Sequence, residues 1–289
     1  MIDIRGLNFS YHKTPVIKDM NLTIHTGEIF GLLGPSGAGK STVQRIMIGS
    51  LRTYEGSVRL FDKEARDLRD RDYHQIGVQP EVPQFYTKYT AMENLTFFSS
   101  MYQAVEVDIP YWVKRVGLEA DIHKRVSDYS KGMKTRLNFI RALLHHPIIL
   151  FLDEPTSGLD PINQKIIKDI IHEMNALGVT IVITTHNMKD VEDLCHSIAF
   201  INHGKILAQG PIHEFLHTSP VHHIRVVVEA GGSFKTEVVE LRQLFTDKYK
   251  DLSEQHMIRL IQSDSSSLND VFIRLAGEGD DEGAQKSEE

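Results

Sequence analysis

Residues 34–41 read Gly-Pro-Ser-Gly-Ala-Gly-Lys-Ser and match the complete phosphate-loop pattern G-x-x-x-x-G-K-S. The loop follows the apolar run Ile29–Leu33, which is typical of a buried strand, and precedes a helix-compatible segment. Its glycines allow successive backbone N–H groups to turn toward phosphates, while the following helix directs its positive N-terminus at the same anion. The pattern predicts a strand, a loop and a helix that together bind a nucleoside triphosphate.

Two side chains at the end of this loop have distinct expected tasks. Lys40 is expected to reach the β- and γ-phosphates, and the Ser41 hydroxyl is expected to ligate Mg²⁺. The residues expected to contact the nucleotide here are Gly34, Pro35, Ser36, Gly37, Ala38, Gly39, Lys40, Ser41 and Thr42. ATP and Mg²⁺ are therefore the expected ligands.

Two carboxylates, Asp153 and Glu154, end a second apolar run that begins near Ile148. In open parallel sheets, ligands bind beyond the carboxyl ends of the strands, so this pair is expected to face the phosphates. Asp153 is predicted to hold Mg²⁺ through a water molecule or through Ser41. Glu154 is predicted to orient or deprotonate the attacking water.

Composition places limits on the class of protein. The 289 residues are 41% hydrophobic and carry a net charge of −7, which disfavours a nucleic-acid partner held by phosphate contacts. No run approaches the roughly 18 to 20 apolar residues of a membrane-spanning helix, and neither a leader nor cysteine pairs are evident. We therefore expect a cytoplasmic protein.

The order of expected elements predicts an α/β fold with several parts. Strands dominate up to about residue 84, helical periodicity dominates residues 86–145, and strand, helix, strand order then returns. This order favours a P-loop NTPase core with a mostly parallel sheet, an antiparallel β subdomain and an inserted helical subdomain.

The C-terminal part is expected to form a small α+β unit over residues 219–277. Strands are predicted at 224–228 and 257–261, a Gly231-Gly232 turn between them, a helix over about 236–249, and a final helix. Residues 278–289 contain six acids and one base and are expected to be disordered.

Several further features occur in a fixed order along the chain. They are Tyr11, the segment Tyr129-Ser130-Lys131-Gly132-Met133, the segment Ser157-Gly158-Leu159-Asp160, and His186 after two threonines. Together with the phosphate loop and the carboxylate pair, this ordered set resembles the ATPase subunit of an ABC transporter over about residues 1–218.

The resemblance implies roles for these residues. Tyr11 would stack on adenine, Ser130 and Gly132 would stand for the family's signature motif, Asp160 would end the D-loop, and His186 would contact the γ-phosphate. Lys131 and Met133 depart from the family's L-S-G-G-Q signature. At the Q-loop position Glu81 replaces glutamine and is the first choice for a Mg²⁺ contact through water, with Gln79 two residues earlier as the alternative.

The family's architecture implies a head-to-tail pair of ATPase subunits, from two identical or related chains, in which the signature of one faces the phosphate loop of the other. Our leading hypothesis is the ATP-hydrolysing subunit of a membrane exporter, resembling multidrug or fluoroquinolone-type ATPases. Because no spanning segment is evident, a separate transmembrane permease would be its partner, and the chain would lie on the cytoplasmic face of the cell membrane. The alternatives are an importer ATPase and a soluble ABC-type ATPase that acts on ribosomes or DNA.

Overall fold

The computed structural model describes residues 1–102, 107–216, 223–230, 233–255, 257–263 and 268–285. The chain divides into two compact units, Met1–Gly210 and Pro211–Glu289. We describe each unit by itself.

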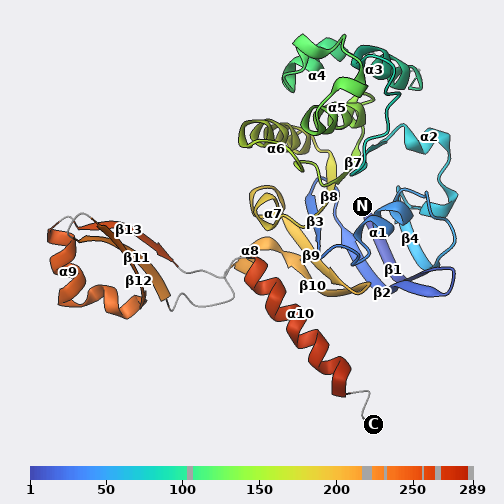
Figure 1. The fold of residues 1–289 in the computed structure, drawn as a ribbon. Helices are drawn as coiled ribbons and strands as arrows, with labels where there is room; N and C mark the ends of the chain where they lie inside the picture. Colours follow the sequence, from blue (N-terminus) through green and yellow to red (C-terminus); the bar gives the residue numbers. More distant parts are fainter. Residues whose placement is uncertain (103–106, 217–222, 231–232, 256, 264–267, 286–289) are drawn as a thin grey trace. The chain divides into compact units, whose positions relative to one another are not determined.

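A six-stranded sheet forms the centre of the first unit (Figure 1). In spatial order its strands are β10 (Lys205–Pro211), β9 (Ser197–Asn202), β3 (Ile29–Leu33), β8 (Thr180–Thr185), β7 (Ile149–Asp153) and β6 (Ile76–Gln79). The strands β9, β3, β8, β7 and β6 pair in parallel. All residues of β3, β7 and β8 are buried, which is typical of parallel strands covered on both faces.

A second, four-stranded sheet lies beside the first and is antiparallel. Its order is β2 (Thr14–Ile24), β1 (Ile2–Tyr11), β4 (Glu55–Leu60) and β5 (Lys63–Glu64). Alternate residues of β1 and β2 point into a core that also contains one face of the parallel sheet. The antiparallel β subdomain expected from the sequence is therefore present.

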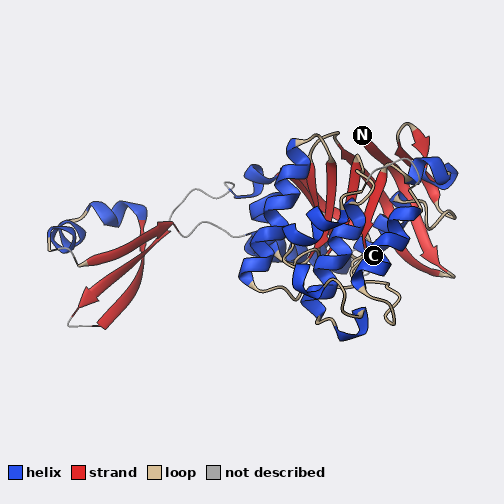
Figure 2. Ribbon diagram, turned by 90° about the horizontal axis from the view of Figure 1, so that it is seen from above, coloured by secondary structure: helices blue, strands red, loops and turns tan. Residues whose placement is uncertain are grey.

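Helices complete the layers of this unit. They are α1 (Lys40–Met47), α2 (Asp70–Tyr73), α3 (Ala91–Ser100), α4 (Ile109–Arg115), α5 (Lys131–Leu143), α6 (Pro161–Ala176) and α7 (Met188–Leu194). The apolar face of α1 packs in the core shared by the two sheets, whereas α5, α6 and α7 contact the strands of the parallel sheet. Figure 2 shows helices running alongside the strands, and Figure 1 shows α3, α4 and α5 together at one end. These three helices fall within residues 86–145. The expected α/β architecture is confirmed.

The second unit contains α8 (Ile212–Leu216), β11 (His223–Ala230), β12 (Ser233–Glu240), α9 (Asp247–Glu254), β13 (Ile258–Ser263) and α10 (Leu268–Gln285). The three strands form an antiparallel sheet in the order β12-β11-β13, and α8 contacts α10. The small sheet and α9 are thus inserted in the sequence between two helices that touch each other.

One expectation for this unit was wrong. The predicted helix over 236–249 begins instead as β12, because its first residues pair with the valine-rich β11, and only residues from Asp247 onward are α-helical. The expected Gly231-Gly232 turn lies outside the described residues. The helix α10 extends to Gln285 and so includes part of the acidic segment 278–289, whose disorder stays a prediction.

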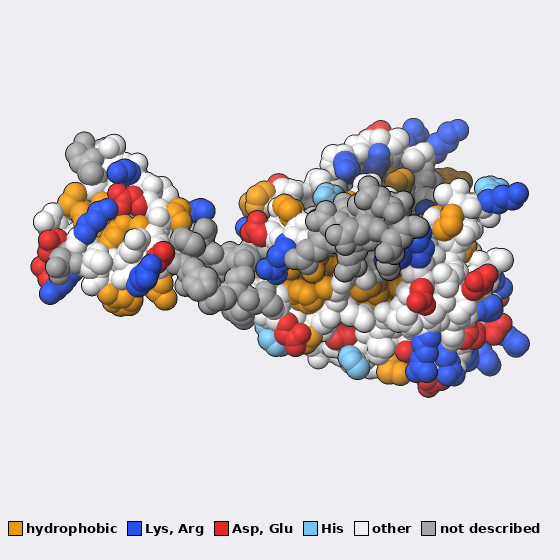
Figure 3. Space-filling view, turned by 90° about the horizontal axis from the view of Figure 1, so that it is seen from below, with side chains coloured by type: hydrophobic (Ala, Val, Ile, Leu, Met, Phe, Trp, Pro, Cys, Tyr) orange, Lys and Arg blue, Asp and Glu red, His pale blue; other side chains and the backbone are white. Residues whose placement is uncertain are grey.

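The described helices include none that is both long enough and apolar enough to span a membrane. On the face drawn in Figure 3, acidic and basic side chains lie interspersed with apolar ones.

Candidate nucleotide site

The phosphate loop joins the carboxyl end of β3 to the N-terminus of α1. Gly39 is the N-cap residue of α1 and has a φ of +111°, a left-handed conformation that suits glycine. A Cβ atom at Gly39 would also lie only 2.7 Å from Cδ1 of Ile17. The left-handed backbone therefore favours glycine here, and a side chain would also displace the end of Ile17 on β2. The loop can present its N–H groups to an anion.

Lys40 lies within the curve of this loop. Its Nζ donates to the carbonyl oxygens of Gly34 at 2.8 Å and Pro35 at 2.9 Å. Burial lowers the pKa of Lys40 below its usual value, and the nearby carboxylates of Glu154, Asp153 and Glu81 oppose this effect. The ammonium group is thus held beside three acids, at the place where phosphate oxygens would bind.

Asp153 is the last residue of β7 and is held by two hydroxyl groups. Oγ of Ser41 donates to Oδ2 at 3.1 Å, and Oγ1 of Thr184 donates to Oδ1 at 2.6 Å. The first contact joins the phosphate loop to the strand carboxylate, as the sequence predicted for a shared cation site. The second was not predicted, although a threonine pair at the end of the buried run 180–185 could have indicated polar contacts there.

Glu154 follows Asp153 directly in the chain. Its φ is +50°, an uncommon value for a residue other than glycine. Oε2 accepts a hydrogen bond from Oγ1 of Thr185 at 2.9 Å, and Oε1 accepts one from the backbone N–H of His186 at 3.0 Å. Nδ1 of His186 lies 2.6 Å from the same Oε1. These contacts fix the carboxylate beside the exposed imidazole.

These side chains surround one pocket of about 490 Å³. Its lining residues are Val16, Pro35, Ser36, Gly37, Gly39, Lys40, Ser41, Thr42, Glu81, Asp153, Glu154 and His186. The pocket thus collects all three residues predicted to be catalytic and all three predicted to hold the metal ion. Val16, from β2, is the one lining residue that the sequence did not suggest.

The chemistry of this pocket fits a magnesium ion bound with phosphate. Ser41 and Asp153 supply a hydroxyl and a carboxylate, and Mg²⁺ in nucleotide sites takes one or two carboxylates together with phosphate oxygens. Within the described part of the chain, no group of three or more His, Cys, Asp or Glu side chains could hold a metal ion by itself.

The Q-loop alternatives occupy different environments. Glu81 lines the pocket, whereas Gln79, at the end of β6, is only 1% exposed. Oε1 of Gln79 is buried and has no hydrogen-bond partner among the described residues. Glu81 is therefore the residue of the two that can meet a ligand in this pocket.

Tyr11 and Asp160 are not among the residues that line the pocket. Tyr11 ends β1, is 39% exposed, and contacts Phe9 edge to face with centroids 4.8 Å apart. Asp160 caps α6 by accepting from the N–H groups of Ile162 and Asn163, both at 3.0 Å, and the hydrogen bond from Asn163 lowers its pKa. Stacking by Tyr11 and nucleotide contact by Asp160 stay predictions.

The proposed signature residues lie at the start of α5, also outside the pocket lining. Ser130 is the N-cap residue, and its Oγ accepts from the N–H of Met133 at 3.2 Å. A Cβ atom at Gly132 would lie 3.2 Å from the carbonyl oxygen of Gly158, so glycine permits close packing of the two motifs. Contact of Ser130 and Gly132 with a nucleotide stays a prediction.

Comparison with known proteins agrees with this site. Residues 17–157 match the family model described as ABC transporter. The fluoroquinolones export ATP-binding protein of Mycobacterium tuberculosis is 42% identical over 281 residues, which cover 96% of this chain and 93% of that protein. The chain belongs to the ABC transporter ATP-binding family.

Other members of the ABC family extend the comparison. Nod factor export ATP-binding protein I of Rhizobium sp. (strain N33) is 32% identical, with coverage of 96% of this chain and 97% of that protein. A solved ATP-binding subunit of an ABC transporter has a TM-score of 0.70 at 26% identity, and covers 75% of this chain and 92% of its own. An ATP-binding cassette solved as a dimer in a post-hydrolysis state with ADP and Pi has a TM-score of 0.65 at 25% identity, and covers 73% and 99%.

The expectation of an exporter-type ABC ATPase is confirmed, and the chain is an ATP-binding and ATP-hydrolysing protein.

Proposed function

We propose that this chain hydrolyses ATP in the pocket described above and drives export through a separate transmembrane permease, from the cytoplasmic face of the membrane. The observation that carries the proposal is the convergence of Lys40, Asp153, Glu154 and His186 in one pocket. The mycobacterial and rhizobial relatives are both export proteins by name, which supports export over import. The mycobacterial relative further suggests a drug-like organic molecule, of which the fluoroquinolones are examples, as the cargo.

The proposed reaction assigns one task to each group. The loop N–H groups and Lys40 bind the β- and γ-phosphates. Ser41 and Asp153, with Glu81 beside them, hold Mg²⁺, which offsets phosphate charge when bound. Glu154 orients a water molecule in line with the γ-phosphate and accepts its proton, so that the new P–O bond forms as the bond to the β-phosphate oxygen breaks. His186 holds Glu154 and donates toward the γ-phosphate.

The site is proposed to be completed by a second ATPase chain. Ser130 and Gly132 lie outside the pocket of their own chain, as they would if they faced the phosphate loop of a partner. The dimeric cassette among the structural relatives supports this arrangement. Each half of the pair would then contribute one phosphate loop and one signature.

An exposed aromatic patch is a suitable surface for the permease. Tyr86, Tyr89 and Phe97 are 50%, 55% and 42% exposed and, with Glu93, line a hollow of about 410 Å³. Tyr86 and Phe97 contact edge to face, with centroids 5.1 Å apart. Contiguous exposed aromatic surface of this kind marks interaction sites. The patch follows Glu81 in the chain, and Glu81 lines the nucleotide pocket. A movement of this segment would therefore couple a partner bound at the patch to the nucleotide site.

Co-purification tests this function. The tagged full chain, expressed in its own host and extracted from membranes in mild detergent, should bring down a polytopic membrane protein in near-equal amount. Tyr86→Ser with Phe97→Ser should lose that protein. Leu177→Ser, at a side chain that is 77% exposed at the C-terminal end of α6, is the matched control and should retain it. Recovery of ribosomes or DNA-associated proteins instead would favour the soluble-ATPase alternative.

A further inference from the structure

Asp190 is a buried carboxylate on α7 that does not line the nucleotide pocket. It is 2% exposed, and its Oδ2 accepts a hydrogen bond from Oγ1 of Thr156, which is itself 4% exposed. Its Oδ1 lies 2.6 Å from Nζ of Lys168, on α6. A carboxylate buried in this way needs a charged partner and hydrogen bonds, and Asp190 has both.

Lys168 completes the cluster at its outer side. Its side chain is 15% exposed and also pairs with Asp193, at 2.7 Å. Burial alone would lower the pKa of Lys168, but its hydrogen bonds to Asp190 and Asp193 raise it above the usual value. The lysine therefore keeps its charge and balances that of Asp190.

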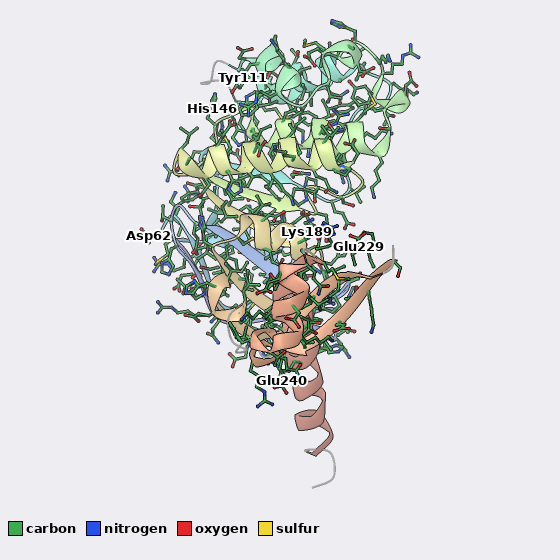
Figure 4. The ribbon with its side chains drawn as sticks, turned by 90° about the vertical axis from the view of Figure 1, so that its left-hand side faces the viewer. Asp62, Tyr111, His146, Lys189, Glu229 and Glu240 are labelled. Atoms are coloured by element: carbon green, nitrogen blue, oxygen red, sulfur yellow. The ribbon has the colours of Figure 1, made fainter. Side chains whose placement is uncertain are left out.

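The position of this cluster relates it to the proposed catalytic pair. Thr156 lies two residues after Glu154, and α7, which carries Asp190, begins two residues after His186. In Figure 4 the label of Lys189 marks α7, well apart from Tyr111 in the helical part of the unit. Asp190 thus joins the two segments that carry Glu154 and His186.

Two hydrogen bonds, which run in opposite directions, join residues 154–156 to residues 185–190. Thr185 donates its hydroxyl to the carboxylate of Glu154 at 2.9 Å, and Thr156 donates its hydroxyl to the carboxylate of Asp190. Each segment therefore supplies one threonine and one carboxylate. A displacement of either segment would break both hydrogen bonds.

Such a restraint is needed at Glu154. A residue other than glycine at φ +50° occupies a sparsely populated conformation, which persists only where the surroundings hold it. The N–H of Ser157 donates to the carbonyl oxygen of Glu154 at 3.1 Å, which forms a tight turn. Glu154, at the start of the turn, is bonded to β8 through Thr184 and Thr185. Thr156, inside the turn, adds a hydrogen bond to Asp190 on α7.

We propose that Asp190 is a positioning residue for ATP hydrolysis, which acts through Thr156 to hold Glu154 in its left-handed turn beside His186. The inference rests on the proposed role of Glu154. It predicts that loss of the Thr156–Asp190 hydrogen bond slows the chemical step without weakening ATP binding, because the phosphate loop and Lys40 do not touch the cluster.

The test compares three variants of the purified full chain. Thr156→Val removes the hydroxyl at nearly constant volume, and Asp190→Leu replaces both carboxylate oxygens by methyl groups that accept no hydrogen bond. Each should lower kcat for ATP hydrolysis by about 10- to 100-fold, since small misplacements of catalytic groups have effects of this size. The ATP dissociation constant should stay within about twofold. Asp193→Asn is the matched control, because Asp193 also pairs with Lys168 but does not contact Thr156, and its kcat should be unchanged.

Glu154→Gln distinguishes failure of the proposed function from failure of the positioning role of Asp190. Full hydrolysis by Glu154→Gln overturns the proposed function itself. If Glu154→Gln is inactive while Thr156→Val and Asp190→Leu keep the wild-type kcat, only the role of Asp190 is overturned. A fall in kcat that is matched by weaker ATP binding and by loss of folded protein in a thermal melt shows a purely structural role, which also overturns it.

Discussion

Nδ1 of His186 lies 2.6 Å from Oε1 of Glu154, and the backbone N–H of the same histidine donates to the same oxygen. The exposed imidazole therefore rests on a carboxylate whose side chain is only 11% exposed. One carboxylate oxygen is engaged by His186 and the other by Thr185, so both oxygens hold Glu154 in one orientation.

This arrangement predicts the behaviour of Glu154→Gln. The amide preserves the shape of the side chain but cannot accept a proton, so turnover should fall by at least about 100-fold. ATP affinity should be retained, because Lys40 and the loop are unchanged. A hydrolysis assay measures the loss of turnover, and a direct ATP titration measures the retained affinity. Light scattering should show a dimer that persists with ATP.

A composite site predicts complementation between two inactive variants. Lys40→Ala removes the phosphate contact, and Ser130→Asp keeps the N-cap of α5 but places negative charge opposite a partner's phosphates. Each variant alone should be inactive. In a mixture, the chain with Lys40 intact can meet the intact Ser130 of the other, so activity should partly return. A mixture as inactive as its components contradicts the head-to-tail pairing.

Glu81 and Gln79 should respond to substitution in opposite ways. Glu81→Ala should lower Mg²⁺-dependent hydrolysis with little change in thermal stability, because Glu81 lines the pocket. Gln79→Leu should leave hydrolysis intact and leave the melting temperature unchanged or raise it, since it removes a buried amide oxygen without a hydrogen-bond partner. The reverse pattern would assign the Q-loop role to Gln79.

Adenine stacking can be tested at Tyr11. Tyr11→Ala should weaken ATP binding by about 1 kcal/mol, the scale of an aromatic stacking contact, whereas Tyr11→Phe should bind nearly as well as wild type. Calorimetric titration provides the measurement. Because Tyr11 also contacts Phe9, a thermal melt of each variant controls for lost packing. Equal affinity in all three proteins would remove Tyr11 from the site.

The C-terminal sheet should become less stable in acid through Glu237. Hydrogen bonds from Lys248 and Tyr249 lower the pKa of Glu237 to about 2, from an ordinary 4.5. A lowered folded-state pKa stabilises the fold above pH 4.5, and this stabilisation is lost as the pH falls toward 2. Glu237→Gln should cost about 1 kcal/mol at pH 7, after allowance for solvent screening, and almost nothing near pH 2.

Methyl NMR signals of Val226 and Val228, in the core of this unit, can follow its unfolding within the full chain. Glu240→Gln is the matched control, because it removes a carboxylate of the same strand whose ion pair is with the highly exposed Arg242, and it should change the stability at pH 7 less than Glu237→Gln does.

The sequence predicted those parts of the site that depend on local patterns. The phosphate loop and the carboxylate pair each lie within a few residues of one strand. A short stretch of sequence therefore predicts both the strand and the reactive residues at its end. The contacts of Thr184 and Thr185 were not foreseen, because they depend on β8 lying beside β7. Asp190 was missed for the same reason, since Thr156, Asp190 and Lys168 come from three separate segments.

The C-terminal unit shows where a local sequence pattern fails to predict secondary structure. The segment from Phe234 to Val239 contains the β-branched residues Thr236, Val238 and Val239 as well as the helix-compatible charges of Lys235 and Glu237. Its pairing with β11 makes it a strand. Hydrogen bonds to a neighbouring strand are not visible in a local pattern, so the boundary between β12 and α9 could not be placed from the sequence.

The contact between α8 and α10 has a consequence for how this chain can change over generations. The small sheet and α9 lie in the sequence between α8 and α10, which contact each other. A single deletion or exchange between residues 217 and 267 would therefore remove or replace the sheet together with α9. The strands, the phosphate loop and the carboxylates would keep their sequence in such an event. The small sheet with α9 can therefore diverge between relatives while the nucleotide site of the first unit is inherited unchanged.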